Sequence, residues 1–175
     1  MSTPRDALPA VIATDRLTLR APHLGDLDAL VALANNRKIS DPSASLPFPY
    51  LTEHGQGFIE RASHKPERRP YAVIDSEDQF IGIVGLHFAA DSLPELGYWL
   101  GEPHWRRGYA TEAVVGLLAA ARATGLFPTI MARVLASNPA SIQVLEKSGF
   151  AVVEHTQSVV ERHRGKPLLI LNWSA

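Results

Sequence analysis

The 175-residue sequence contains no cysteine. Disulfide bonds, thiolate metal sites and a cysteine nucleophile that carries an acyl group are therefore excluded. The sequence also lacks any run of eighteen uncharged apolar residues, and its first ten residues lack the apolar segment of a signal peptide. These absences predict a cytoplasmic protein without a membrane partner.

A surplus of charge of one sign is also lacking. The formal net charge is −1, and 46% of the residues are hydrophobic. This composition predicts one globular domain over residues 1–175, with residues 1–10 flexible. Balanced charge gives no broad electrostatic footprint for nucleic acid, so we expect no nucleic-acid partner. The seven histidines do not fall at metal-ligand spacings, so we also expect no metal.

Two common phosphate-binding loops are missing, because the sequence has neither Gly-Lys-Ser/Thr after a glycine-rich loop nor Gly-x-Gly-x-x-Gly. Residues 106–113, Arg-Arg-Gly-Tyr-Ala-Thr-Glu-Ala, still predict an anion site, since a turn with a glycine leads directly into helical apolar spacing. Free N–H groups and the helix dipole attract anions at a helix start. Gly108 permits close backbone approach, and Arg106 and Arg107 add positive charge. The natural ligand is a pyrophosphate; a simple solvated loop is the alternative.

The segments around this turn alternate between strands and helices. Asn138 suits a helix N-cap, Pro139 the first helical position and Gly149 the residue just past the end. Together they predict an α/β (α+β) fold with a mixed, mostly antiparallel central sheet flanked by helices. The predicted strands are 11–20, 71–75, 80–88, 95–101, 129–135, 150–160 and 167–173, and the predicted helices are 26–35, 52–63, one over about 110–121 and one from 139.

These motifs resemble the GNAT superfamily of acyl-CoA-dependent N-acyltransferases, and within it the branch of ribosomal-protein N-terminal alanine and serine acetyltransferases. Gly108 and Ala110 fill the last two fixed positions of the superfamily's acyl-CoA motif. Trp105 occupies the first, where Gln or Arg is usual, but an aromatic residue there is similar to this branch. Residues 14–20, 46–52 and 138–150 extend the resemblance. It implies a GNAT-type fold with acetyl-CoA as cosubstrate.

The resemblance also implies a donor site. The pantetheine arm would pair as an added strand with the strand predicted over 95–101. A bulge at Gly97 would open the backbone hydrogen bonding near the thioester. Asn138 could reach the arm or act only as a helix cap. The expected acetyl-CoA-binding residues are Tyr98, Trp99, Leu100, Arg106, Arg107, Gly108, Tyr109, Ala110, Thr111 and Asn138.

Two residues are catalytic candidates. Glu95 lies on the strand 95–101 that leads into the site and is the candidate base, acting through a water, although it could be an ordinary exposed carboxylate. Many superfamily members use a tyrosine to protonate the leaving thiolate, but Leu145 occupies that position. Ser141 is the substitute candidate, with Tyr98 as a weaker alternative, and the alternative for Ser141 is an ordinary polar residue in the first helical turn.

The acceptor is expected to be a primary amine. An α-amine with a pKa near about 8 is partly neutral at pH 7, so the N-terminus of a protein or peptide is the first hypothesis. The alternatives are a small amine (polyamine, aminoglycoside or amino acid) or a non-catalytic acyl-CoA sensor. A peptide enzyme should have an open groove, and a small-amine enzyme a closed acidic pocket. Monomer and homodimer both stay open. The acids to compare are Asp41, Glu53 and Glu95, and the aromatic candidates for the acceptor pocket are Phe48, Tyr50 and Tyr71.

Overall fold

The computed structural model describes residues 4–175. Its elements alternate as the sequence patterns predict, with short 3₁₀ turns (η) between them. In chain order they are α1 (Pro4–Ala7), β1 (Val11–Ala13), β2 (Thr18–Arg20), η1 (Leu24–Asp26), α2 (Leu27–Ala34), α3 (Arg37–Ser40), α4 (Thr52–His64), β3 (Arg68–Ile74), β4 (Phe80–His87), β5 (Glu95–Leu100), η2 (Glu102–His104), α5 (Tyr109–Thr124), β6 (Thr129–Leu135), α6 (Pro139–Lys147), β7 (Ala151–Gln157), η3 (Glu161–His163) and β8 (Pro167–Ser174).

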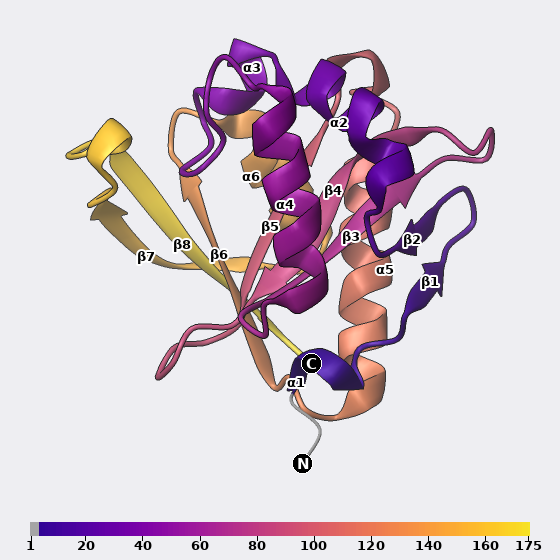
Figure 1. Ribbon diagram of the computed structural model, residues 1–175. Coiled ribbons are helices and arrows are strands. Elements are labelled where there is room, and N and C mark those ends of the chain that lie inside the picture. Colours follow the sequence, from indigo (N-terminus) through magenta and orange to yellow (C-terminus); the bar gives the residue numbers. More distant parts are fainter. Residues whose placement is uncertain (1–3) are drawn as a thin grey trace.

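The strands form one eight-stranded sheet in the order β1-β2-β3-β4-β5-β6-β8-β7. Within residues 4–175 all neighbouring strands are antiparallel except β5 and β6, which are parallel and paired only at Glu95 and Met131. Figure 1 shows β5 and β6 spreading apart from this point, with α4 in front of the sheet and α5 behind it. The predicted mixed, mostly antiparallel α/β fold is confirmed.

Each face of the sheet has its own hydrophobic core. Behind the sheet, Val114 and Leu117 of α5 are fully buried against a cluster that includes Val84 and Leu86 of β4. In front, Leu30 of α2 and Ile59 of α4 pack with a second cluster that contains Ile83. The sheet is therefore covered on both faces, and alternate residues of β4 and β5 point into different environments.

The helix boundaries follow the capping residues that the sequence indicates. Gly108 at the N-cap of α5 and Gly125 at its C-cap both adopt left-handed φ values, of 78° and 69°. Asn138 Oδ1 accepts a hydrogen bond from the Ser141 N–H at 3.2 Å, Pro139 begins α6, and Gly149 has a φ of 95° just past its end. The predicted cap role of Asn138 is confirmed.

Three local predictions differ from the structure. The single strand expected over 11–20 is a hairpin of β1 and β2, because Thr14 and Leu17 bond to each other across a turn. The strand expected over 150–160 ends at Gln157, since residues 158–166 form a longer loop.

The third difference concerns residues 1–10, which we expected to be flexible. Residues 1–3 lie outside the described part of the chain. In the remainder, Arg5 donates hydrogen bonds to the Arg68 and Ala62 carbonyl oxygens, and Leu8 is only 2% exposed. This segment therefore packs on the body of the fold. No helix within residues 4–175 has the length and apolar character needed to cross a membrane.

Candidate active site

The divergence of β5 and β6 leaves one edge of β5 without a partner strand. Met131 N–H donates to the Pro94 carbonyl at 2.9 Å, and no pairing continues beyond Glu95. Gly101 N–H donates to Ile81 of β4, and bonds alternate along an antiparallel ladder. The backbone groups of Tyr98 therefore point away from β4, into the gap beside β6. This edge can accept an extended ligand as an added strand.

A continuous cleft of about 1830 Å³ includes this gap and extends to the front of the sheet. It is larger than the roughly 300–1,000 Å³ of an ordinary small-molecule pocket. Behind the gap it is lined by the starts of α5 and α6, and in front by α4 and by the loops that contain residues 42–47 and 158–160. The cleft can therefore hold a long donor and an acceptor that meet at β5.

The turn before α5 presents open backbone N–H groups. Gly108 and Arg106 have left-handed φ values of 78° and 61°, and no side chain within residues 4–175 caps the N-terminus of the helix. Gly108, Tyr109, Ala110, Thr111 and Arg106 line the cleft. Arg107 does not, and its carbonyl oxygen accepts a hydrogen bond from Arg16 at 2.9 Å. The geometry fits an anion held by backbone groups at a helix start.

Glu112, which is not among the predicted site residues, holds this turn in place. Its carboxylate accepts hydrogen bonds of 2.7 Å from the Thr14 hydroxyl, the Arg16 N–H and the Arg16 guanidinium. Burial alone would raise the pKa of Glu112, but the bonds from Thr14 and Arg16 outweigh it and the pKa is lowered. The Arg16 guanidinium also lies 4.5 Å from the Tyr109 ring centre. These partners of Glu112 are about 96 residues away in sequence, so the local sequence pattern indicated only an acidic residue in the first turn of the helix.

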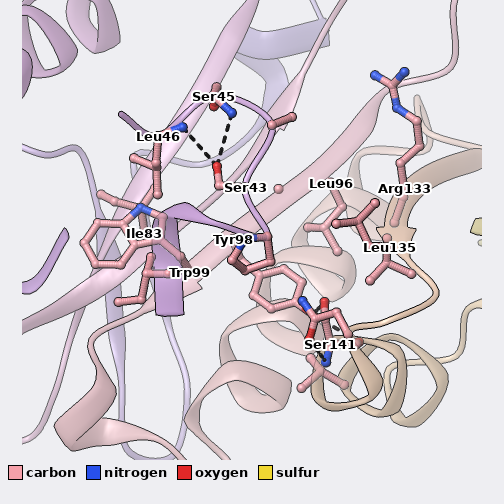
Figure 2. Close-up of a pocket in the computed structure, with 18 of the residues that line it drawn as sticks. Ser43, Ser45, Leu46, Ile83, Leu96, Tyr98, Trp99, Arg133, Leu135 and Ser141 are labelled. Atoms are coloured by element: carbon pink, nitrogen blue, oxygen red, sulfur yellow. Dashed lines mark hydrogen bonds between the residues drawn. The ribbon is translucent and has the colours of Figure 1, made fainter. Parts of the chain in front are cut away.

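Tyr98 and Ser141 meet behind the gap, as Figure 2 shows. Their hydroxyl oxygens lie 2.7 Å apart, and the Tyr98 hydroxyl also donates to the Ser141 carbonyl at 3.2 Å. Burial raises the pKa of Tyr98 to about 12, against the opposing effect of the bond to Ser141. The phenol is therefore a neutral hydrogen-bond donor at physiological pH. Both candidate donors belong to one hydrogen-bonded pair beside the cleft.

Trp99 points to the opposite face of β5 from Tyr98. Its ring makes an edge-to-face contact with Phe80, with centroids 6.2 Å apart, in the front core. Leu100 is 6% exposed, and its carbonyl accepts from Trp105 Nε1 at 2.7 Å. Trp99 and Leu100 can therefore offer a donor mainly backbone atoms.

The expected bulge at Gly97 is wrong. The β4–β5 register runs unbroken from Gly82 opposite Leu100 to His87 opposite Glu95. Gly97 pairs directly with Gly85 within this regular ladder. A Cβ at Gly97 would have nothing within 4 Å, so open space lies above it. The gap is created by β6 turning away and not by a distortion of β5.

Glu95 lies at the front of the cleft in a two-pronged ion pair. Its carboxylate oxygens accept hydrogen bonds from the Arg133 guanidinium at 2.9 and 2.6 Å. These bonds raise the pKa of Arg133. Glu95 is thus on the face where the acceptor would approach, but both carboxylate oxygens already have a partner.

The predicted aromatic lining is only partly present. Tyr50 lines the cleft and is 4% exposed. Tyr71 is fully buried behind the sheet, where its hydroxyl donates to the Pro9 carbonyl at 2.6 Å, so its expected pocket role is wrong. Phe48 is 42% exposed beneath Arg37, outside the cleft lining. Strand aromatics near a sheet centre pack in a core more often than they face a ligand.

Two loops join over the front of the cleft, and we call them the clasp loops: residues 41–47 and 158–166. Arg162 Nη1 donates to the Ser40, Ser43 and Leu46 carbonyl oxygens at 3.1, 3.0 and 2.7 Å. His163 is 4% exposed, and its Nε2 lies 2.6 Å from the Asp41 carbonyl oxygen. The Asp41 carboxylate itself points toward Arg37 and does not line the cleft. Figure 2 shows Ser43, Ser45 and Leu46 above Trp99 and Ile83.

Among residues 4–175, no group of three or more His, Cys, Asp or Glu side chains is placed to hold a metal ion. The polar groups at the site include backbone amides, hydroxyls, imidazoles and the ion-paired carboxylate of Glu95. This set can hold an anionic donor and move protons.

Comparisons with known proteins agree with the fold. A curated relative, the uncharacterized N-acetyltransferase p20 of Bacillus licheniformis, is 29% identical over 142 residues, which cover 78% of this chain and 80% of the relative. A solved ribosomal L7/L12 alpha-N-protein acetyltransferase in complex with coenzyme A has a TM-score of 0.82 at 14% identity, covering 94% of this chain and 97% of that one. A solved spermidine N-acetyltransferase from Vibrio cholerae, in complex with CoA and spermine, has a TM-score of 0.78 at 22% identity, covering 92% and 96%.

The acetyltransferase (GNAT) domain family matches residues 16–151, from the β1–β2 turn to the start of β7. This range contains the anion turn, the free edge of β5 and the Tyr98–Ser141 pair. The chain therefore belongs to the GNAT acetyltransferase domain family and is an N-acetyltransferase that uses acetyl-CoA as its acyl donor.

Proposed function

We propose that the protein transfers the acetyl group of acetyl-CoA to the N-terminal α-amine of a protein or peptide. The observation that carries this proposal is the charge of the cleft lining. Six Lys and Arg side chains line the cleft but only three Glu side chains, one of which, Glu95, is bound by Arg133. The cations are Lys38, Arg61, Arg68, Arg106, Arg133 and Lys147, and the acids are Glu53, Glu95 and Glu154.

This lining disfavours a polyamine acceptor. The several positive charges of a polyamine would be repelled by the Lys and Arg side chains of the partly desolvated cleft, where screening is weaker than in water. Asp41, one of the acids that an amine pocket would need, lies outside the lining. A peptide N-terminus brings one positive charge and a chain that can extend along a large cleft. The size and charge of the cleft therefore support a peptide or protein acceptor.

The donor-side residues fit acetyl-CoA. The N–H groups at Gly108, Tyr109, Ala110 and Thr111 are suited to the pyrophosphate, and Arg106 adds charge. The free edge of β5, with Tyr98, Trp99 and Leu100, is suited to the amides of the pantetheine arm. Asn138 reaches the cleft as the cap of α6, and Arg107 would act from outside the lining. Residues 1–175 would then work as a single acyl-CoA N-acyltransferase domain.

The leaving thiolate needs only modest help, because a thiol pKa is near about 8.5. We assign the proton donation to the Tyr98–Ser141 pair, in which Ser141 can pass a proton and Tyr98 can replace it. Glu95 is the candidate base from the sequence. Both of its carboxylate oxygens already accept hydrogen bonds from Arg133.

The test is release of free CoA thiol from acetyl-CoA with matched acceptors. Peptides that begin with Ser, Ala or Met are compared with spermidine, aminoglycosides and single amino acids, and N-terminally blocked copies of each peptide serve as controls. We expect turnover with free peptides and none with blocked ones. Turnover with small amines alone would contradict the proposed acceptor. Acetyl-CoA binding by calorimetry without any turnover would indicate a sensor.

A further inference from the structure

Four polar side chains form a transverse row across four neighbouring strands at the front of the cleft. Arg68 of β3 is opposite His87 of β4, and His87 is opposite Glu95 of β5. Glu95 is bonded in turn to Arg133 of β6. Directly opposed residues on antiparallel strands project to the same face, with Cβ atoms about 4.5–5.5 Å apart. We call these four residues the polar row, and all of them line the cleft.

The polar row lies where β5 and β6 begin to separate. Glu95 is the last paired residue of β5 on the β6 side, and the open space above Gly97 begins two residues further along on the same face. A donor bound along the free edge of β5 would bring its reactive end toward this vertex. His87 lies directly opposite Glu95 on the neighbouring strand. A general base at this position can act on the acceptor's amine through a single water.

We propose that His87 is the general base that takes the proton from the acceptor's amine, and that Arg133 keeps Glu95 in place beside it. This inference rests on the proposed function. Of the two groups, Glu95 already has both oxygens bonded, whereas the His87 ring has no hydrogen-bond or ion-pair partner within residues 4–175.

The surroundings keep His87 ready to accept a proton. The ring is exposed at the cleft surface, but the cleft walls withdraw it from bulk water, and this burial lowers the pKa of His87. Arg68 and Arg133 lower it further, while Glu95 raises it. From α4, which covers this face, Arg61 and His54 also line the cleft. The net effect is a neutral imidazole at pH 7.

The proton balance is as follows. The protonated amine, R–NH₃⁺, loses one proton to His87, and its nitrogen then bonds to the thioester carbonyl carbon as the carbon–sulfur bond breaks. The nitrogen releases a second proton to water, and the thiolate gains one from the Tyr98–Ser141 pair, which is reprotonated from solvent. His87 returns its proton to water, so one proton is released for each acetyl group moved.

The test compares His87→Gln with His155→Gln, an exposed histidine on β7 outside the cleft lining, and with Glu95→Gln. We expect His87→Gln to lower kcat by about 100-fold or more with the acetyl-CoA Kd unchanged. His155→Gln should match the wild type, and Glu95→Gln should lose less than His87→Gln. Imidazole buffer should restore part of the activity of His87→Ala. Wild-type kcat should fall only below pH 6.5, since the folded pKa is lowered and the base is lost on protonation.

A His87→Gln protein with kcat within threefold of wild type would overturn the inference. So would a His87 pKa above 7 in an NMR titration of the ring, a readout that needs no acceptor. If no peptide or small amine were acetylated by the wild type, the proposed function would fail, and the NMR titration would still decide whether His87 is held neutral.

Discussion

The donor end of the cleft is made mainly of backbone atoms from two neighbouring segments, whereas the acceptor end is made of side chains from many. The anion turn and the free edge of β5 need only a left-handed Gly108 and the divergence of β6. The polar row and the clasp loops draw on β3, β4, β5, β6 and two loops far apart in sequence. Backbone recognition tolerates changes of side chain, so donor binding can persist while the acceptor end changes its specificity.

The largest effect on donor binding should come from breaking the donor end at Gly108. Gly108→Ala places a Cβ at a φ of 78° and 3.3 Å from the Arg16 guanidinium, so the turn must shift. If one charge-assisted bond to the pyrophosphate is lost, acetyl-CoA should bind about 10- to 100-fold more weakly by calorimetry. Gly125→Ala is the matched control, because Gly125 is left-handed at the far end of the same helix and its Cβ would meet nothing. Equal Kd values for the two variants would contradict the anion site.

The junction between the two ends is tested through the Tyr98–Ser141 pair. Tyr98→Phe and Ser141→Ala should each lower kcat by about 10- to 100-fold and leave the acceptor KM nearly unchanged, because each removes a proton donor and not a binding surface. The double variant should be little worse than either single one. Ser148→Ala, on the same helix with its hydroxyl bonded only to the Val144 carbonyl, should keep full kcat. Additive losses would mean that the two hydroxyls do not act as a unit.

The smallest effect should come from loosening the acceptor end alone. Arg162→Leu removes one donor that serves three carbonyl oxygens of the opposite loop, so the clasp loops should separate. We expect the acceptor KM to rise by about tenfold, roughly the free energy of one charged hydrogen bond, with the acetyl-CoA Kd unchanged. Arg164→Leu, an exposed change two residues before the end of the same loop, is the control. A weaker acetyl-CoA Kd in Arg162→Leu would show that the two ends are coupled.

The fold could be predicted because each of its main signals is local. Asn138, Pro139 and Gly149 mark the limits of α6, and alternating apolar residues mark the β3–β4 hairpin. The hairpin of β1 and β2 was missed, although its turn is local. Thr14 N–H donates to the Leu17 carbonyl oxygen and Leu17 N–H donates to the Thr14 hydroxyl, a turn within a run that the apolar pattern predicts as one strand.

The donor part of the site was predictable for the same reason, and the acceptor part was not. Gly108 and the residues after it are one short segment with its own signature. The pairing of Tyr98 with Ser141 depends on how α6 packs against β5, and the engagement of Glu95 by Arg133 depends on the β5–β6 register. Gly97 suggested a bulge, but the β4–β5 register is unbroken there. Such pairings are set by tertiary contacts.

The contact of Arg162 with three carbonyl oxygens links the evolution of the two clasp loops. Because one guanidinium nitrogen donates to three carbonyl oxygens, the contact depends on the backbone conformation of residues 40–46. A relative with an insertion in that loop could keep the contact only if residues 158–166 changed as well. The two loops should therefore vary together among relatives, although more than a hundred residues separate them. Changing the acceptor specificity by grafting loops from a relative would require replacing residues 40–46 and 158–166 together.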